Sequence, residues 1–254
     1  MSSRPVRYAA LSLAVLFAFS ACSSDSGTEP RVDEIAVLAF DGADDYVEVP
    51  AAAALDLTGN LTLAAWFFFT GGFTGEAGLI QKDGDGSFGR YGLWVLGDEV
   101  DFCVYIAGGS QHCMYAQEGL TMNAWNHVAG VYDGAEMRLY INGELDSSQN
   151  VSGAISTSSG SLFIGADPTE SRYLAGRLHD VQLWSVARTG AQIAAAMTTP
   201  PTGAEAGLVG YWPFDDGSGQ VAGDATGNGL AATLGASAAA DASDPAWATT
   251  AWPN

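Results

Sequence analysis

The sequence predicts an all-β fold in which antiparallel strands pack in two layers, and three observations lead to this prediction. Residues 125–145, WNHVAGVYDGAEMRLYINGEL, contain Asp-Gly at 133–134 and Asn-Gly at 142–143, dipeptides that two-residue hairpin turns favour. Residues 61–69, LTLAAWFFF, are apolar on both faces, as in a central strand between two layers. Glycine is abundant and helix signals are scarce, which is typical of many short strands joined by tight turns.

Alternation divides the first hairpin strand into two faces. One face carries Trp125, His127, Ala129 and Val131, and the residues between them form the other face. Tryptophans occur within several strand patterns of this kind, and at such positions a tryptophan is more often a core residue than a sugar platform. These tryptophans are Trp66, Trp94, Trp125 and Trp184.

Six motifs follow one another between residues 38 and 200. They are LAFDGADDYVEVP (38–50), LTLAAWFFF (61–69), LIQKDG (79–84), the hairpin at 125–145, SLFIGADP (161–168) and LAGRLHDVQLWSVART (174–189). This series resembles bacterial laminin-G-like domains of the concanavalin A-like lectin/glucanase superfamily. The resemblance implies a two-sheet antiparallel jelly-roll sandwich. It leaves the function open, because the superfamily holds sugar-binding modules, hydrolases and adhesion domains.

The N-terminal region has the pattern of an export signal. Arg4 and Arg7 precede an apolar run at 8–19, which has the length of a signal-peptide core and is too short to span a bilayer. The following Ser20-Ala21-Cys22 resembles a bacterial lipobox, with Phe19 where such boxes usually carry Leu. We therefore expect a lipoprotein signal at 1–22, a lipid on Cys22 and a flexible tether at 23–34. The alternative is an ordinary secretory signal with an incidental cysteine.

A lipid anchor would hold the protein at the bacterial cell envelope, at the outer membrane or cell surface. The formal net charge is −20, and removal of the signal would also take away two arginines. A strongly acidic chain without a basic cluster does not bind nucleic acid or anionic lipid electrostatically. Contact with a membrane is expected only through the lipid anchor.

Two further cysteines remain, in DFCVYIAGGSQHCMY. When the hairpin is centred on Gly108, Cys103 and Cys113 face each other across the strands. A cross-strand disulfide is feasible there, and an exported location would preserve it. The alternative is a pair of buried free thiols.

The C-terminal part of the chain begins with a short predicted helix at 189–197, which Pro200-Pro201 ends. Residues 207–234, GLVGYWPFDDGSGQVAGDATGNGLAATL, resemble the opening strands of laminin-G-like domains, although here they follow the hairpin core. They either complete the same sandwich or begin a truncated second repeat. We favour completion, because an isolated strand pair cannot bury Tyr211, Trp212 and Phe214. The prediction is one domain at 35–254, with its core at 35–200.

Recognised catalytic patterns do not occur in the sequence. Glycan-cleaving members of the superfamily carry closely spaced carboxylates of the E-x-D-x-E kind, and this chain has no such cluster. It also lacks the G-x-S-x-G elbow and zinc-ligand spacing. We expect a protein that is not an enzyme.

Aromatic residues in predicted loops are the better candidates for stacking on the apolar face of a sugar. Each could alternatively be an anchor that packs its loop onto the sandwich. The candidates are Phe73, Phe88, Tyr91 and Tyr173.

The resemblance also implies a structural calcium ion, which takes six to eight oxygen ligands. In domains of this type the ion lies between the FDG turn and the aspartate of the last strand. These positions correspond here to Asp41, with Asp44 beside it, and to Asp180 in LHDVQLW. Asp224 and Asn228 in DATGNG offer an alternative or additional pair. The other interpretation is that these residues bond their own turns or a strand end.

Together these features predict a non-catalytic, surface-exposed binding module, with a glycan as the most favoured ligand and calcium as a structural ion. The first alternative is an adhesion or scaffold domain that binds a surface protein. The second is a degenerate glycoside hydrolase.

Overall fold

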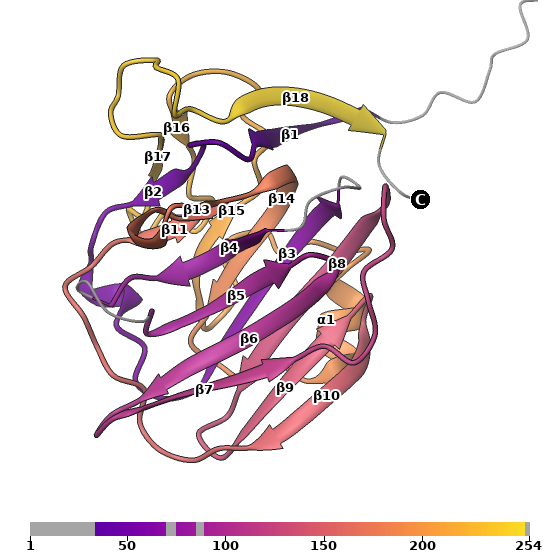
Figure 1. Cartoon of the computed structure of the whole chain (residues 1–254), viewed down its shortest axis with the longest axis vertical. Helices are drawn as coiled ribbons and strands as arrows, with labels where there is room; N and C mark the ends of the chain where they lie inside the picture. The colour runs from indigo at the N-terminus through magenta and orange to yellow at the C-terminus, as the bar shows by residue number, and fades with distance from the viewer. Residues whose placement is uncertain (1–33, 70–74, 85–88, 252–254) are drawn as a thin grey trace, which may run out of the picture. The chain divides into compact units, whose positions relative to one another are not determined.

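The fold consists mainly of two antiparallel sheets that stack face to face, as the sequence predicts (Figure 1). The computed structural model describes residues 34–69, 75–84 and 89–251. Cys22, Phe73 and Phe88 lie outside the described residues. Of the described residues, none belongs to a helix long and apolar enough to cross a membrane.

One sheet, sheet A, is built around the predicted central strand. Its strands are β1 (Glu34–Asp41), β3 (Leu61–Phe69), β8 (Trp125–Tyr132), β9 (Glu136–Ile141), β10 (Glu144–Asn150), β14 (Ala175–Trp184), β15 (Leu208–Trp212) and β18 (Ala246–Ala251). They follow the order β10-β9-β8-β3-β14-β1-β18, and β15 pairs with the C-terminal half of β14.

The other sheet, sheet B, has the order β16-β17-β2-β11-β4-β5-β6-β7. Its strands are β2 (Val47–Val49), β4 (Glu76–Lys82), β5 (Tyr91–Leu96), β6 (Glu99–Ile106), β7 (Ser110–Tyr115), β11 (Leu162–Ile164), β16 (Val221–Ala222) and β17 (Ala232–Leu234). A small two-stranded sheet joins β12 (Ala166–Asp167) to β13 (Arg172–Tyr173), and two short 3-10 helices are η1 (Ala53–Leu55) and η2 (Pro168–Glu170).

The facing surfaces of the two sheets form the main core. Alternate residues of β5, β6 and β8 point into it, among them Leu93, Phe102 and Val128, all fully buried. Gly130 of β8 lies directly under the Phe102 ring, too close for any side chain at that position. Glycine at this position therefore lets the Phe102 ring of sheet B pack against the backbone of β8.

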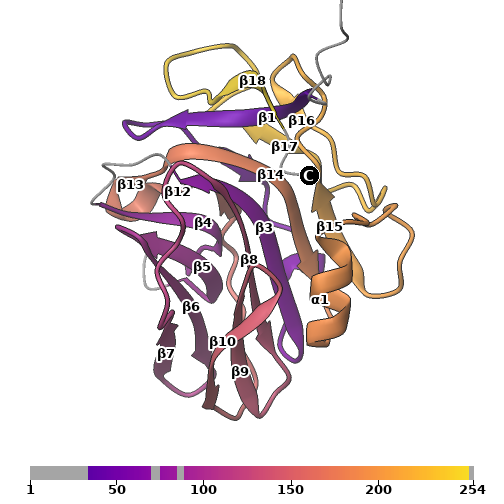
Figure 2. The ribbon, with the colours of Figure 1, turned by 90° about the vertical axis from the view of Figure 1, so that its right-hand side faces the viewer.

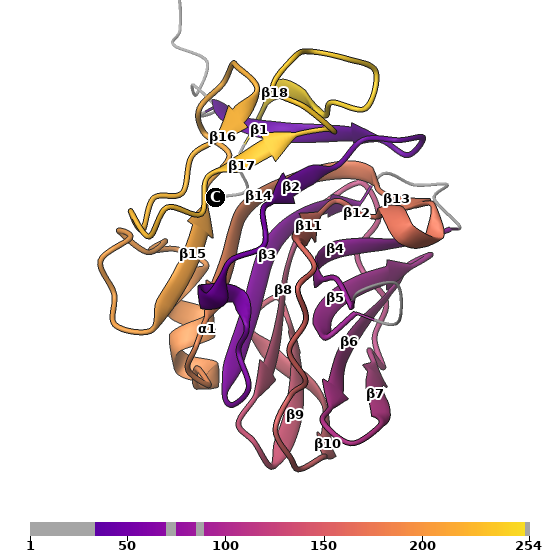
Figure 3. The ribbon, with the colours of Figure 1, turned by 90° about the vertical axis from the view of Figure 1, so that its left-hand side faces the viewer.

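The one α-helix among the described residues, α1 (Gly190–Ala196), covers part of the outer face of sheet A. It begins with a capping box in which the Thr189 hydroxyl accepts the Gln192 N–H and the Gln192 side chain accepts the Thr189 N–H. Ile193 packs against Ala129 and Val131, whose side chains point away from the main core. Figures 2 and 3 show α1 on the opposite side of sheet A from sheet B.

The C-terminal segment contributes strands to both sheets: β15 pairs with β14, β18 with β1, and β17 with β2. Trp212 and Phe214 are fully buried, and the Trp212 indole donates to the Leu230 carbonyl at 2.8 Å. These contacts make residues 208–251 part of the same core as the hairpins.

The predicted disulfide is confirmed. Cys103 and Cys113 are directly paired across β6 and β7, with their Cα atoms 4.1 Å apart, and they form a disulfide bond. The bond lies on the outer face of sheet B, because the flanking Phe102 and Val104 point into the core.

Trp212→Ala tests the contribution of the C-terminal strands. We expect a loss of about 3–5 kcal/mol in the free energy of unfolding, because a fully buried indole is removed. Trp247→Ala, at a half-buried tryptophan of β18, is the matched control and should cost less. Denaturant unfolding measures both variants, and equal losses would contradict this assignment of the core.

Candidate functional site

The outer face of sheet B carries polar and aromatic side chains in alternation with the buried ones. Gln81 of β4, Trp94 of β5, Asp101 and Tyr105 of β6 and Tyr115 of β7 all project from this face, which we call the sheet B face. It lies on the side of the sandwich away from α1 (Figures 2 and 3).

The strand register brings these residues together in rows. Trp94 is directly paired with Asp101, and Asp101 with Tyr115. Directly paired residues on one face of a sheet lie within side-chain contact distance. Tyr115, at the end of the row, is 55% exposed, so its ring is accessible to a ligand beside Asp101.

Glycines shape the middle of the face. The Trp94 ring lies over Gly92, where a Cβ atom would come within 2.6 Å of it. A Cβ atom at Gly89 would lie 3.4 Å from Trp94 Cζ2 and 3.5 Å from Gln81 Oε1, so the amide and the indole edge meet at this glycine. Glycine at position 92 thus leaves room for the indole ring.

Two hydrogen-bond acceptors of the face have no partner. Gln81 is 1% exposed and Asp101 is 6% exposed, yet Gln81 Oε1 and Asp101 Oδ1 accept no hydrogen bond from any residue that the structure describes. A buried polar atom without a partner costs about 1–3 kcal/mol. Arg90, which stacks over the Tyr105 ring at 5.2 Å, adds an unpartnered Nε–H donor. The face thus holds hydrogen-bonding capacity that the protein does not use.

The Asp101 carboxyl is in an unfavourable place for a charge. Burial, together with repulsion from Glu76 and Glu99, raises its pKa to about 7. A donor or cation supplied from outside would relieve this cost.

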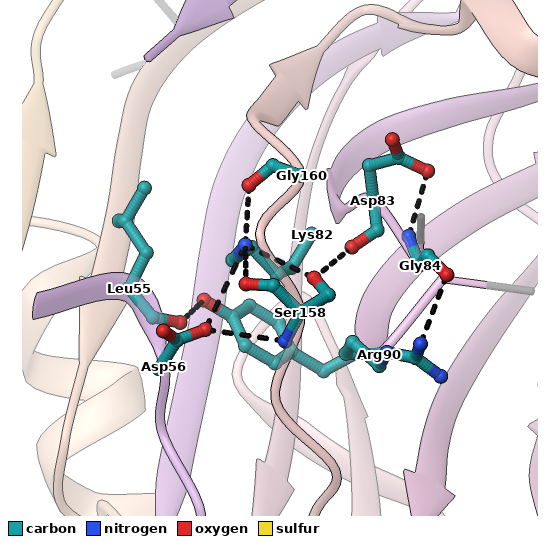
Figure 4. Close-up of polar contacts among 9 residues, drawn as sticks. Leu55, Asp56, Lys82, Asp83, Gly84, Arg90, Ser158 and Gly160 are labelled. Atoms are coloured by element: carbon teal, nitrogen blue, oxygen red, sulfur yellow. Dashed lines mark hydrogen bonds and ion pairs between the residues drawn. The ribbon is translucent and has the colours of Figure 1, made fainter. Parts of the chain in front are cut away.

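Buried Lys82 holds the end of β4 in place next to Gln81 (Figure 4). Its ammonium group donates to the carbonyl and hydroxyl of Ser158, both at 3.1 Å, and to the Gly160 carbonyl, and it lies 3.7 Å from Asp56. The Ser158 hydroxyl in turn donates to the Asp83 carbonyl. All three ammonium protons have protein acceptors, so Lys82 has a structural role in positioning the face.

The structure does not bring all the predicted metal ligands together at one site. Asp41 and Asp44 lie together, and Asp45 joins them, with a carboxylate oxygen from each within 4.8 Å of the others. Asp180 does not: Asp41 is paired with Ala175, five residues along β14, so Asp180 lies roughly 16 Å farther along the strand. A single site that contains both Asp41 and Asp180 does not form in this structure.

Asp45, which sequence analysis did not select, is the buried member of this acidic cluster. Burial raises its pKa to about 6, and repulsion from Asp41, Asp44 and Asp244 acts in the same direction. One Asp45 oxygen accepts the Asp41 N–H at 2.7 Å. A buried carboxylate surrounded by like charges fits a hard divalent cation, because the cation would remove the repulsion.

The remaining predicted ligands have structural partners. Asp180 has a positive φ of 58° at the bulge of β14, and its side chain is hydrogen-bonded to Tyr211, while its buried Oδ1 has no partner among the described residues. Asp224 accepts from the backbone N–H groups of Thr226 and Leu230, at 3.0 and 3.1 Å, and the Asn228 amide donates to Val209 O at 2.9 Å. Asp224 thus organises its own loop and Asn228 ties that loop to β15, while their use as metal ligands stays a prediction.

The structure places the two described aromatic candidates, Tyr91 and Tyr173, in different environments. Tyr91 is a correction: it points into the core, is 1% exposed and donates its hydroxyl to the Leu55 carbonyl at 2.7 Å, so it cannot stack on an external sugar. Tyr173 is half-buried in β13. Its partner strand β12 crosses the sheet B face at Gly78, where the Ala166 carbonyl occupies the place of a Cβ atom. Tyr173 therefore lies at the border of the face.

A second candidate site is a hollow of about 590 Å³, which opens between the β7–β8 connection and the β9–β10 hairpin and which we call the second hollow. It is lined by Gln117, Glu118, Gly119, Thr121, Ile141, Asn142, Glu144, Leu145 and Asp146. Both Asp146 oxygens accept backbone N–H groups, from Gln117 and Glu118. None of the lining residues has a buried polar atom without a partner, so the hollow is the weaker candidate.

Sequence comparison agrees with the fold. The family model of the concanavalin A-like lectin/glucanases superfamily matches residues 41–194, more than half of the chain. The chain belongs to this superfamily. No curated protein sequence matches it.

Solved structures with the same concanavalin A-like fold include a proposed carbohydrate binding protein from Bacteroides ovatus. It has a TM-score of 0.65 and 21% identity, over 85% of this chain and 60% of that one. The binding domain of Paraclostridial Mosquitocidal Protein 1 has a TM-score of 0.50 and 12% identity, over 63% of this chain and 44% of that one. The chain thus spans less than two thirds of either protein, and these identities show the fold alone.

Asp101→Asn tests the electrostatic state of the face. Because the folded-state pKa of Asp101 is raised to about 7, the wild type gains stability as the pH falls from 7 towards 4, and at pH 8 it carries the full cost of the buried charge. The variant is expected to melt at least about 2 °C above the wild type at pH 8. At pH 5 the difference should disappear. A variant that is less stable at pH 8 would contradict this account.

Proposed function

We propose that the protein is a non-catalytic carbohydrate-binding module whose ligand lies on the sheet B face. The observation that carries the proposal is the pair of unpartnered, buried acceptors, Gln81 Oε1 and Asp101 Oδ1, beside the exposed ring of Tyr115. A sugar presents hydroxyl donors around its edge and apolar C–H groups on its faces. The donors would satisfy the two acceptors, and an apolar face would stack on Tyr115.

Binding is better supported than hydrolysis at this face. Glycoside hydrolysis needs two carboxyl groups that face the same bond. Glu76, the acidic neighbour of Asp101 on β4, is bound to Arg172 at 3.1 Å, and this ion pair supports a role in positioning the β12–β13 segment. The family and the similarity to a proposed carbohydrate binding protein support the same ligand class.

The acidic cluster of Asp41, Asp44 and Asp45 is proposed as a structural calcium site. The ion would neutralise the repulsion at Asp45 and fix the turn after β1, with backbone carbonyls or water completing its oxygen ligands. Display at the bacterial cell envelope through a lipid on Cys22 is a further part of the proposal, and it rests on the sequence of the N-terminal region.

The carbohydrate proposal is tested on a glycan array with the wild type and two variants. Gln81→Leu preserves the shape of the side chain but removes the acceptor, and Tyr115→Ala removes the exposed ring. Each is expected to weaken binding about five- to tenfold, since a lost hydrogen bond or stacked ring is worth about 1–1.5 kcal/mol. Leu145→Ala, at an equally exposed side chain of the second hollow, is the control and should bind like the wild type. Loss of binding only in Leu145→Ala would place the ligand elsewhere.

The calcium proposal is tested by thermal unfolding with calcium and with chelator. Calcium is expected to raise the melting temperature of the wild type, because it binds the folded state alone. Asp45→Asn should abolish this rise, whereas Asp180→Asn should retain it. A rise that survives Asp45→Asn, or disappears in Asp180→Asn, would refute the acidic cluster as the site.

A further inference from the structure

We infer that the sheet B face is built for a glycan that carries a protonated amine, an amino sugar whose ammonium group pairs with Asp101. This inference rests on the proposed function and specifies its ligand class. It starts from the one carboxylate on the face that is nine-tenths buried and retains an unpartnered oxygen.

The groups around Asp101 leave it without a counter-charge. The residues paired with it on either side are Trp94 of β5 and Tyr115 of β7, and neither is a cation. The charged groups whose fields reach it are Glu76 and Glu99, and both repel it. Arg172 is bound to Glu76, and Arg90 stacks over Tyr105 and donates to the Gly84 carbonyl at 2.9 Å. The local field is therefore negative.

Such a field discriminates among sugars by charge. A uronic or sulfated sugar would add a further negative charge next to Asp101, Glu76 and Glu99. A neutral sugar could supply only a neutral hydroxyl donor. An ammonium group would form a charge-assisted hydrogen bond, which is roughly twice as strong, and the exposed Tyr115 ring could add a cation–π contact.

The inference also predicts a proton balance. Free Asp101 is mostly protonated at pH 6, because its pKa is raised to about 7. An ammonium group would stabilise the ionised carboxylate, so binding at pH 6 releases a proton from Asp101. The charged and titratable groups that face Asp101 are Glu76, Glu99, Tyr115 and, through Glu76, Arg172.

The experiment is calorimetry at pH 6 with the full chain and two tetramers of the same length, one of glucosamine with free amines and one of N-acetylglucosamine. The wild type is expected to bind the amine tetramer about tenfold more tightly, with a binding enthalpy that depends on the buffer because a proton is released. Asp101→Asn should bind both tetramers equally and release no proton. Asp101→Glu, which retains the charge, should keep a preference for the amine.

Glu144→Gln controls for attraction by the overall negative charge, since Glu144 is an exposed residue of β10 in the other sheet. It should keep the full preference. The inference is overturned if the wild type shows no preference, or if the preference persists in Asp101→Asn or falls equally in Glu144→Gln. Binding of neutral glycans without any preference for amines would overturn the inference and leave the proposed function intact. Failure of every glycan to bind would overturn both. Thermal melts of each variant establish that it is folded.

Discussion

The register of β5 against β6, and of β6 against β7, is the constraint on which the proposed site depends. It pairs Trp94 with Asp101, Asp101 with Tyr115, and Cys103 with Cys113. A slip of one residue would turn Asp101 into the core and expose the side chains that now fill it. The disulfide fixes β6 to β7, and Lys82 anchors the end of β4, which pairs with β5. A disulfide bond and a buried lysine thus stabilise the face that carries the two unpartnered acceptors.

Patterns of neighbouring residues predicted much of this fold. The hairpin dipeptides, the short helix after Thr189 and the opposition of Cys103 and Cys113 are all local in sequence, and the structure confirms them. The sequence analysis does not predict the sheet B face. It assigns Trp94 to the core tryptophans, and Asp101 is a single acidic residue in an apolar strand. Alternation within YGLWVL and EVDFCVYI could have placed both on the outer face. Their meeting, however, depends on the pairing of strands, which no local pattern specifies.

The same limit explains the aspartates and Tyr91. Asp41 and Asp180 belong to adjacent strands, so a motif that joins them is plausible in sequence, yet their positions along the strands differ by about five residues. Asp45, one residue beyond Asp44, completes the cluster instead because the turn after β1 folds back and the Asp41 N–H binds its carboxylate. Tyr91 begins β5 on its inward face, where its hydroxyl finds the Leu55 carbonyl. A loop assignment wrong by one or two residues was enough to turn a core residue into a surface candidate.

The central claim is that ligand binds on the outer face of sheet B. The most direct measurement is a crystal structure of the protein with a glycan that it binds. The account predicts a sugar ring against Tyr115, with donors within hydrogen-bond distance of Asp101 Oδ1 and Gln81 Oε1. A sugar in the hollow between the β7–β8 connection and the β9–β10 hairpin, with the sheet B face unchanged, would contradict it.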